Sequence, residues 1–232
     1  MDDLSSRLAG VDAAIADAAR AAGRDPGELT RIVVTKFHPP ELVHALHELG
    51  VRDIGENRQQ ELTAKIDAVG ALPGLRWHFI GQAQRNKARA LRGAASLVPL
   101  TVHSVDRDRL ADALDAAAGP DDPVLDVLIQ VNLTDDAGRG GVGPDGVEAL
   151  AAHVLGLPSL RLRGVMGVAP LDEPPAPAFA RLRASADTVR ALAPAAGWMS
   201  AGMTADFAEA IAAGATHLRI GTAITGPRPA GG

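Results

Sequence analysis

The first apolar run of the sequence ends in a lysine. Residues 32–35 read Ile-Val-Val-Thr, a β-branched run typical of a buried strand, and Lys36 follows directly. Barrel and open-sheet proteins keep their reactive groups at the carboxyl ends of such strands. An amine that is partly desolvated there can form a Schiff base with an aldehyde. The alternative is a lysine that marks the strand end and reaches water, the commoner outcome for a charged residue considered alone.

Two later strand ends are rich in small and hydroxyl residues. Residues 200–204 read Ser-Ala-Gly-Met-Thr, and residues 219–223 read Arg-Ile-Gly-Thr-Ala. Small residues let a backbone approach an anion closely, and Ser200 and Thr222 add hydroxyl groups. A helix predicted to start near Thr204 would add free amides. Either cluster alone is more often an ordinary loop, but two on adjacent strands favour a phosphate site.

Polar residues also end the second and third predicted strands. Asn57 can both donate and accept hydrogen bonds towards a ligand. Glu56 is a candidate general base or cation partner, although a lone acid is more often structural. His78 is as compatible with packing as with function. The other histidines show no metal-ligand spacing beyond chance, so no metal site is predicted.

Strands and helices are predicted to alternate along most of the chain. Strands are expected at residues 31–36, 52–57, 77–81, 96–102, 124–132, 162–167, 198–202 and 217–221. Helices are expected at residues 41–49, 59–68, 86–91, 107–118, 146–155, 178–192 and 204–213. This order implies a parallel sheet, and eight repeats in about this length favour a closed (β/α)8 TIM barrel, an α/β fold, over an open doubly wound sheet. The weakest strand is 96–102, because it contains Pro99.

An amphipathic helix is predicted before the first strand. Apolar side chains recur there at helical spacing, at Leu4, Leu8, Val11 and Ile15. Gly23 lies just past the expected helix end. We expect this helix to cover one end of the fold. No linker divides the sequence, so we predict one domain over residues 1–232, with the helix and lead-in at 1–30 and the barrel at 31–228.

Composition excludes several classes of protein. The chain has 232 residues, 47% of them hydrophobic, with 4 Phe, 2 Trp and no Tyr, which predicts an aliphatic core. It has no cysteine, so disulfides, thiolate metal sites and a cysteine nucleophile are absent. A net charge of -5 gives no electrostatic reason to expect nucleic acid or an anionic membrane as partner. The basic stretch at 85–92 is interpreted as a solvated helix face. With no secretory signal or membrane-spanning run in view, a cytoplasmic protein is expected.

Short segments spread over nearly the whole sequence match one known family in order. They are Thr35-Lys36, Gly55-Glu56-Asn57, Trp77-His78-Phe79-Ile80-Gly81, Gln84, Asn86-Lys87, His103-Ser104-Val105-Asp106, Gln130-Val131-Asn132, Arg163-Gly164-Val165-Met166, Ser200-Ala201-Gly202-Met203-Thr204, Asp206 and Arg219-Ile220-Gly221-Thr222-Ala223-Ile224. Each is weak alone, but the ordered set, from Ile32 to Arg228, closely resembles the pyridoxal phosphate homeostasis protein family. That family is a barrel similar to the N-terminal domain of bacterial alanine racemase, the type III fold of pyridoxal phosphate proteins.

The resemblance implies a cofactor and roles for individual residues. Pyridoxal phosphate (PLP) would be bound, with Lys36 as the Schiff-base lysine and Asn57 lining the pocket. Arg219 matches the arginine near the pyridine nitrogen. The phosphate-binding positions match Ser200, Gly202, Gly221 and Thr222. Three residues depart from the usual pattern without removing a cofactor contact: Phe37, Thr204 and Thr225.

Two function classes remain open, with a third more distant. By resemblance, the chain would store, buffer or deliver PLP inside the cell, without robust catalysis of its own, and apo PLP-dependent enzymes would be possible recipients. The alternative is an amino-acid racemase or decarboxylase. The alanine racemase type needs a tyrosine opposite the lysine, and this sequence contains none. A lysine-dependent aldolase acting on a phosphorylated sugar shares the barrel, lysine and phosphate clusters. With no obvious dimerisation domain, a monomer is expected.

Overall fold

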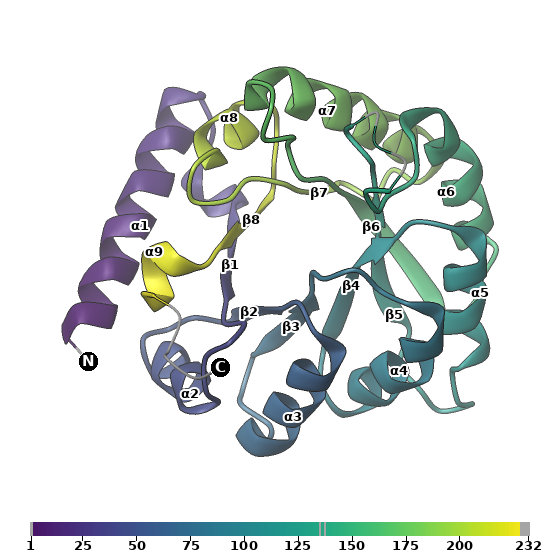
Figure 1. The fold of residues 1–232 in the computed structure, drawn as a ribbon, viewed down its shortest axis with the longest axis horizontal. Helices are drawn as coiled ribbons and strands as arrows, with labels where there is room; N and C mark the ends of the chain where they lie inside the picture. The colour runs from purple at the N-terminus through teal and green to yellow at the C-terminus, as the bar shows by residue number, and fades with distance from the viewer. Residues whose placement is uncertain (1, 135, 137, 228–232) are drawn as a thin grey trace.

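Eight parallel strands close into a barrel in chain order (Figure 1). The computed structural model describes residues 2–134, 136 and 138–227. Within that part of the chain the strands are β1 (Thr30–Val34), β2 (Asp53–Glu56), β3 (Arg76–Phe79), β4 (Leu100–Val105), β5 (Leu125–Gln130), β6 (Leu160–Met166), β7 (Trp198–Ser200) and β8 (His217–Ile220). The barrel closes because β8 pairs with β1, with Ile32 opposite Arg219. The predicted closed (β/α)8 fold is confirmed; residue 228, the last of the predicted barrel, lies outside the described residues.

Helices surround the strands as an outer ring (Figure 1). Those that connect successive strands are α2 (Glu41–Glu48), α3 (Gln59–Val69), α4 (Ala88–Leu97), α5 (Asp108–Ala116), α6 (Val147–Leu155), α7 (Pro175–Leu192) and α8 (Phe207–Ala212). The chain also forms α1 (Asp2–Ala21), α9 (Thr222–Thr225) and short 3-10 turns at Pro26–Glu28, Arg85–Lys87 and Pro144–Gly146. None of the helices in the described residues is both long and apolar enough to cross a bilayer.

The main apolar core lies between the strands and the helical ring. Strand residues that face outward, such as Val33, Ile54 and Val102, are fully buried there. Helix residues such as Leu62 and Leu110 pack against them from the outside and are also fully buried. The core is mainly aliphatic, as the composition predicts; its large aromatic side chains are Trp77, Phe79 and Phe179.

The prediction for the fourth strand is wrong in its boundaries. Residues 96 and 97 end α4, and β4 begins only at Leu100 and continues to Val105. Helix α4 therefore starts and ends later than the 86–91 predicted. Pro99 is the reason for the boundary, because proline cannot continue a helix and disfavours helical backbone in the residue before it.

Two differences lie at the carboxyl ends of β7 and β8. Helix α8 begins at Phe207 and not near Thr204, because the amide of Met203 donates to Asp206 Oδ1 at 2.6 Å and residues 203–205 stay in a loop. The short helix α9 directly after β8 was not predicted. The segment after β7 is therefore a loop at the barrel mouth, and the segment after β8 is the start of a short helix there.

The predicted N-terminal helix exists, but it runs along the side of the barrel instead of covering an end. Helix α1 packs against α8 and α9 in the outer ring (Figure 1). Near its start, Arg7 Nε donates to the carbonyl of Ile224 at 2.7 Å, beside the carboxyl ends of the strands. Just beyond its end, Arg24 Nη1 donates to the carbonyl of Ala215 at 2.6 Å, beside the amino ends. The helix therefore spans the full height of the barrel wall.

Candidate functional site

A cavity of about 520 Å³ opens at the carboxyl ends of β1, β2 and β8. Five of the seven predicted site residues line it: Lys36, Asn57, Arg219, Gly221 and Thr222. The remaining lining residues are mostly apolar or hydroxylic: Val34, Phe37, His38, Ile80, Val168, Met203, Thr204, Ala205 and Thr225. The barrel therefore brings together residues that lie almost two hundred positions apart in the sequence.

Lys36 lines this cavity, and its amine has no hydrogen-bond or ion-pair partner among the described residues. Its Nζ lies 5.9 Å from the centroid of the Phe37 ring. The backbone just before it is fixed, because the Thr35 amide donates to the carbonyl of Gly55 at 3.1 Å. Lys36 therefore places in the cavity, two residues beyond the end of β1, an amine that no described residue hydrogen-bonds or pairs with, and its role as a Schiff-base lysine stays a prediction.

The turn that follows Lys36 has an unusual backbone. Phe37 has a φ of 68°, the left-handed region that side-chain-bearing residues rarely adopt. Its amide donates to Glu61 Oε2 at 3.2 Å, and its ring lies 5.2 Å from the Arg58 guanidinium. Contacts from the segment that begins α3 therefore stabilise a conformation that the local sequence disfavours.

A buried ion pair lies behind this turn. Lys65 from α3 pairs with Glu56 at the end of β2, and the two are 5% and 0% exposed. Thr35 Oγ1 also donates to Glu56 at 2.6 Å, and Lys65 Nζ donates to the carbonyl of Thr35 at 2.7 Å. Burial raises the pKa of Glu56, and hydrogen bonds from Lys65 and Thr35 act in the opposite direction. Neither residue lines the cavity, so Glu56 is a cation partner that supports the lysine-bearing strand, not a base facing the cavity.

Asn57 presents an unused polar atom. Its Oδ1 is buried and has no hydrogen-bond partner among the described residues. The backbone there is closely packed, because a Cβ at Gly81 would lie 1.8 Å from the Asn57 carbonyl oxygen. Gly81 therefore has a steric reason to be glycine. An unpaired buried acceptor is costly, so the position suits a ligand that supplies a donor.

Residues 204–205 and 221–222, which all line the cavity, have open backbone amides. These N–H groups donate to no group of the described residues. Gly221 leaves space in front of them, since a Cβ there would come only within 3.7 Å of Val34. Thr204 and Thr222, which are both exposed and line the cavity, add hydroxyls. This combination suits a phosphate. Thr204 was not among the predicted site residues. Its hydroxyl, within the small and hydroxyl residues 200–204, is the sequence feature that could have identified it.

Arg219 is buried in the barrel interior and reaches the cavity wall. Its exposed fraction is 5%, and it donates from Nη1 to Ser200 Oγ at 2.8 Å and from Nη2 to the Gly167 carbonyl at 2.9 Å. Burial lowers the pKa of Arg219 to about 10, while the charge of Asp206 acts in the opposite direction. The guanidinium is therefore still charged at neutral pH and can donate hydrogen bonds into the cavity.

Comparison with known proteins finds relatives that match this chain over nearly the whole of both sequences. The profile of the alanine racemase N-terminal domain matches residues 32–229. A Pseudomonas aeruginosa protein named pyridoxal phosphate homeostasis protein is 41% identical, covering 100% of this chain and 98% of its own. A relative of the same name from Mycobacterium tuberculosis is 40% identical over 97% and 93% of the two chains. This chain belongs to the pyridoxal phosphate homeostasis protein family.

A solved structure of a homologue agrees with this assignment. PipY of Synechococcus elongatus, determined with PLP bound, is 32% identical and superimposes with a TM-score of 0.80, over 95% of this chain and 99% of that one. The two proteins therefore resemble each other in sequence as well as in fold. The family membership expected from the ordered segments is thereby confirmed.

Two residues that the family resemblance assigns to phosphate binding lie beneath the cavity. Ser200 is fully buried, and its hydroxyl contacts Arg219 and His103 inside the barrel. Gly202 has a φ of 90°, and a Cβ there would lie 2.7 Å from Ala210 Cβ. Packing of α8 against the loop therefore requires glycine at 202. Neither residue is part of the cavity lining, and their phosphate role stays a prediction.

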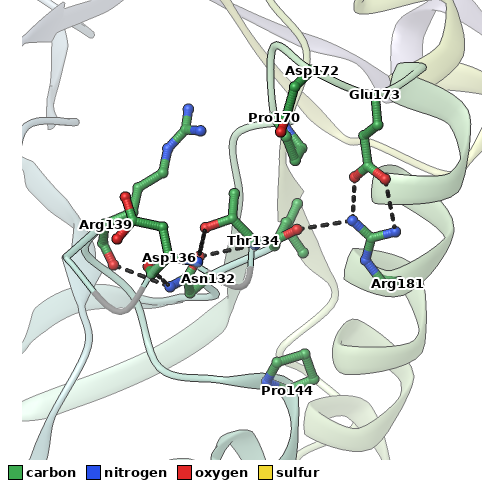
Figure 2. Close-up of a pocket in the computed structure, with 10 residues that line it drawn as sticks. Asn132, Thr134, Asp136, Arg139, Pro144, Pro170, Asp172, Glu173 and Arg181 are labelled. Atoms are coloured by element: carbon green, nitrogen blue, oxygen red, sulfur yellow. Dashed lines mark hydrogen bonds and ion pairs between the residues drawn. The ribbon is translucent and has the colours of Figure 1, made fainter.

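A second hollow lies on the same face, over the loops after β5 and β6 (Figure 2). Its volume is about 610 Å³, and its described lining contains no lysine. Arg181 pairs there with Glu173 (Figure 2). Arg181 Nη2 also donates to the Leu133 carbonyl at 2.8 Å. Arg181 and Glu173 are paired with each other, and the described residues that line this hollow offer no amine that could form a Schiff base, so the cavity at Lys36 is the better candidate for a family cofactor site.

Proposed function

We propose that this chain binds pyridoxal phosphate reversibly on Lys36 and stores, buffers or delivers it to apo PLP-dependent enzymes. The observation that carries the proposal is the unpaired Lys36 amine, which shares one cavity with the open amides of residues 204–205 and 221–222. An amine that adds to an aldehyde with loss of water, opposite a phosphate cradle, matches the two reactive ends of PLP. We further propose that the protein acts in the cytoplasm as a monomer.

The residues of the cavity fit the parts of this cofactor. The amides and hydroxyls near Thr204 and Thr222 would hold the phosphate. The unused Asn57 Oδ1 offers an acceptor to a ring hydroxyl. Arg219 would donate to the pyridine nitrogen. When bound, PLP supplies an electron-accepting ring and a reactive aldehyde.

Arg219 also favours a carrier over an enzyme. An arginine can donate a hydrogen bond to the pyridine nitrogen but cannot supply a proton to it, so the ring stays uncharged and is a weaker electron acceptor. An acidic partner would do the opposite. Such a ring is less prone to carbanion chemistry, which suits a stored cofactor.

Visible absorbance tests the proposed function. We expect apo protein titrated with PLP to develop a visible band with one equivalent bound, because a Schiff base of pyridoxal absorbs there. The same spectrum separates this proposal from a phosphosugar aldolase, whose lysine adducts are colourless. Absence of any band at saturating PLP would exclude the proposed function.

The PLP-loaded protein is expected not to racemise or decarboxylate amino acids at enzymatic rates. The chain contains no tyrosine, so the acid–base group that alanine racemases place opposite their lysine is absent. Incubation with L-alanine, followed by chiral chromatography, measures this. Turnover within the ordinary range of about 1–1000 per second would refute it.

Replacing Gly221 with valine should weaken PLP binding without unfolding the protein. A Cβ at Gly221 has no close protein neighbour, so the added methyls would occupy the proposed phosphate space. Loss of charge-assisted hydrogen bonds of about 1.5–3 kcal/mol corresponds to a loss of affinity of about 10- to 100-fold. Gly143→Val is a matched control, because Gly143 also has open space but lies outside the cavity. Equal affinity of Gly221→Val and parent would disprove the phosphate assignment.

A further inference from the structure

A continuous chain of polar side chains crosses the barrel interior from Arg219 to Asp53. Arg219 Nη1 lies 2.8 Å from Ser200 Oγ, which lies 3.0 Å from His103 Nδ1. His103 Nε2 lies 3.0 Å from His78 Nδ1, and His78 Nε2 lies 2.9 Å from Asp53 Oδ1. We call Ser200, His103, His78 and Asp53 the interior chain. Its members come from β7, β4, β3 and β2, and all are at most 6% exposed.

Hydrogen-bond donors and acceptors fix the direction of this chain. Arg219 has only N–H donors, so Ser200 Oγ accepts from it and its own hydroxyl proton is free to go to His103 Nδ1. His103 must then carry its proton on Nε2 and donate it to His78 Nδ1. His78 in turn donates from Nε2 to the Asp53 carboxylate. In the opposite direction His78 would donate from Nδ1 to His103. Its Nε2 would still have to carry a proton, because an unprotonated ring nitrogen facing the Asp53 carboxylate would be repelled, so His78 would be doubly protonated.

The two ends of the chain carry opposite charges. Burial raises the pKa of Asp53, but hydrogen bonds from His78 and Arg76 outweigh it and bring the pKa to about 2. Arg76 holds this carboxylate with two hydrogen bonds, at 2.8 and 2.6 Å, at the amino end of the barrel. Burial lowers the pKa of His103 well below its usual value, so this ring is neutral. Ser200 and the two histidine rings thus connect an anion, Asp53, at one end of the barrel to a cation, Arg219, at the other.

Arg219 depends on this arrangement for its orientation. Within the described residues no carboxylate forms a hydrogen bond or ion pair with Arg219; its side chain donates to the Ser200 hydroxyl and the Gly167 carbonyl. A hydroxyl group rotates freely unless its proton is hydrogen-bonded to an acceptor. Only when the Ser200 proton has such an acceptor does a lone pair of Oγ stay directed at the Arg219 guanidinium. His103 supplies that acceptor, and His78 and Asp53 hold His103 in the required tautomer.

We propose that the interior chain positions Arg219 for its contact with the cofactor ring, with His103 as the residue that fixes the Ser200 hydroxyl. This role rests on the proposed function. It makes His103 and His78 positioning residues, since neither lines the cavity. The same arrangement explains why the hydroxyl of Ser200, at the end of β7, is held inside the barrel by Arg219 and His103.

Histidine tautomers in the apo protein test the chain without any cofactor. Long-range ¹H–¹⁵N correlation spectra of the histidine side chains should show His103 and His78 both neutral, protonated on Nε2 and bare on Nδ1. A proton on His103 Nδ1, or a doubly protonated His78, would overturn the proposed direction. This measurement uses the unmodified protein, so it does not depend on any variant folding.

Paired His→Phe variants test the consequence for the cofactor. His103→Phe removes the acceptor of the Ser200 hydroxyl, and we expect PLP affinity to fall about 10-fold and the ¹⁵N resonance of the bound pyridine nitrogen to shift. His217→Phe is the matched control: His217 is also buried in the interior and its ring centroid lies 6.4 Å from that of His78, but its ring hydrogen-bonds Thr216 and makes no hydrogen bond to the chain. We expect both variants to lose stability but only His103→Phe to change affinity and resonance.

The outcomes distinguish this proposal from the proposed function. If the parent protein fails to bind PLP, the proposed function fails, while the tautomer measurement still reports on the chain. If PLP binds normally and His103→Phe behaves like His217→Phe in affinity and ring resonance, the chain has only a structural role and the inference is wrong. Partial recovery of both readouts in His103→Gln, whose amide can still donate to His78, would support it further.

Discussion

Replacing Lys36 with alanine should abolish covalent capture of PLP. Lys36 is the lysine that lines the cavity, and no described group occupies its amine. Lys65 is buried in the ion pair with Glu56, so its amine is not available. With only phosphate and ring contacts left, we expect the visible band to disappear and the affinity to fall by at least about 100-fold, or about 2.8 kcal/mol.

Borohydride reduction followed by peptide mass mapping checks this prediction. In the parent protein, the reduced adduct should appear on the peptide that contains Lys36, and in Lys36→Ala no adduct should form. Lys87→Ala is the control, because Lys87 lies in the 3-10 turn before α4, outside the cavity, and its loss should change nothing. An adduct found only on Lys65 or Lys87 of the parent would show that the site has been misassigned.

The alternation of strands and helices was predictable because it depends on local patterns. Parallel strands that are buried on both faces read as continuous apolar runs, such as Ile32–Val34, and the barrel follows from their number and order. Boundaries depend on details that local patterns resolve poorly. The end of α4 at Leu97 and the start of β4 at Leu100 are separated by Pro99, and only the proline gave a hint.

The sequence predicted which strand ends contribute to the site, but not which of their side chains reach the cavity. Lys36, Asn57 and Gly221 face the cavity because they continue the inward-facing register of their strands. Ser200 does not line the cavity, and its hydroxyl accepts a hydrogen bond from Arg219 inside the barrel. The sequence shows which residues end a strand, but whether a side chain reaches a cavity depends on strand stagger, which is a property of the closed barrel.

The ion pair between Glu56 and Lys65, which lies behind Lys36, could not be predicted from the sequence. Glu56 suggested either a general base or a cation partner, and Lys65 gave no signal as its partner, nine residues away on the next helix. The structure joins them beside the Thr35 carbonyl, one residue before the reactive lysine. Their contribution to the site is therefore indirect, through the backbone that carries Lys36.

Lys65→Met should destabilise the protein by about 3–5 kcal/mol at neutral pH. The substitution keeps most of the side-chain volume but leaves the fully buried Glu56 carboxylate without its cation. It also removes the donor to the Thr35 carbonyl, so PLP affinity should fall as well. Denaturant unfolding of the apo protein measures the first effect. The double variant Glu56→Gln with Lys65→Met should recover most of the loss, because a neutral amide is far cheaper to bury than a charge.

The pH dependence of this loss identifies its cause. Burial already raises the pKa of Glu56 from its ordinary 4.5, and removing Lys65 deletes two of the interactions that oppose this rise. A carboxyl whose folded-state pKa is raised costs nothing below its unfolded-state pKa, where both states are protonated. Above that value the unfolded state ionises first, so the stability difference between Lys65→Met and parent should be small near pH 4.5 and grow as pH rises. A difference that stays constant between pH 4.5 and 8 would mean that lost packing, and not an uncompensated charge, causes the destabilisation.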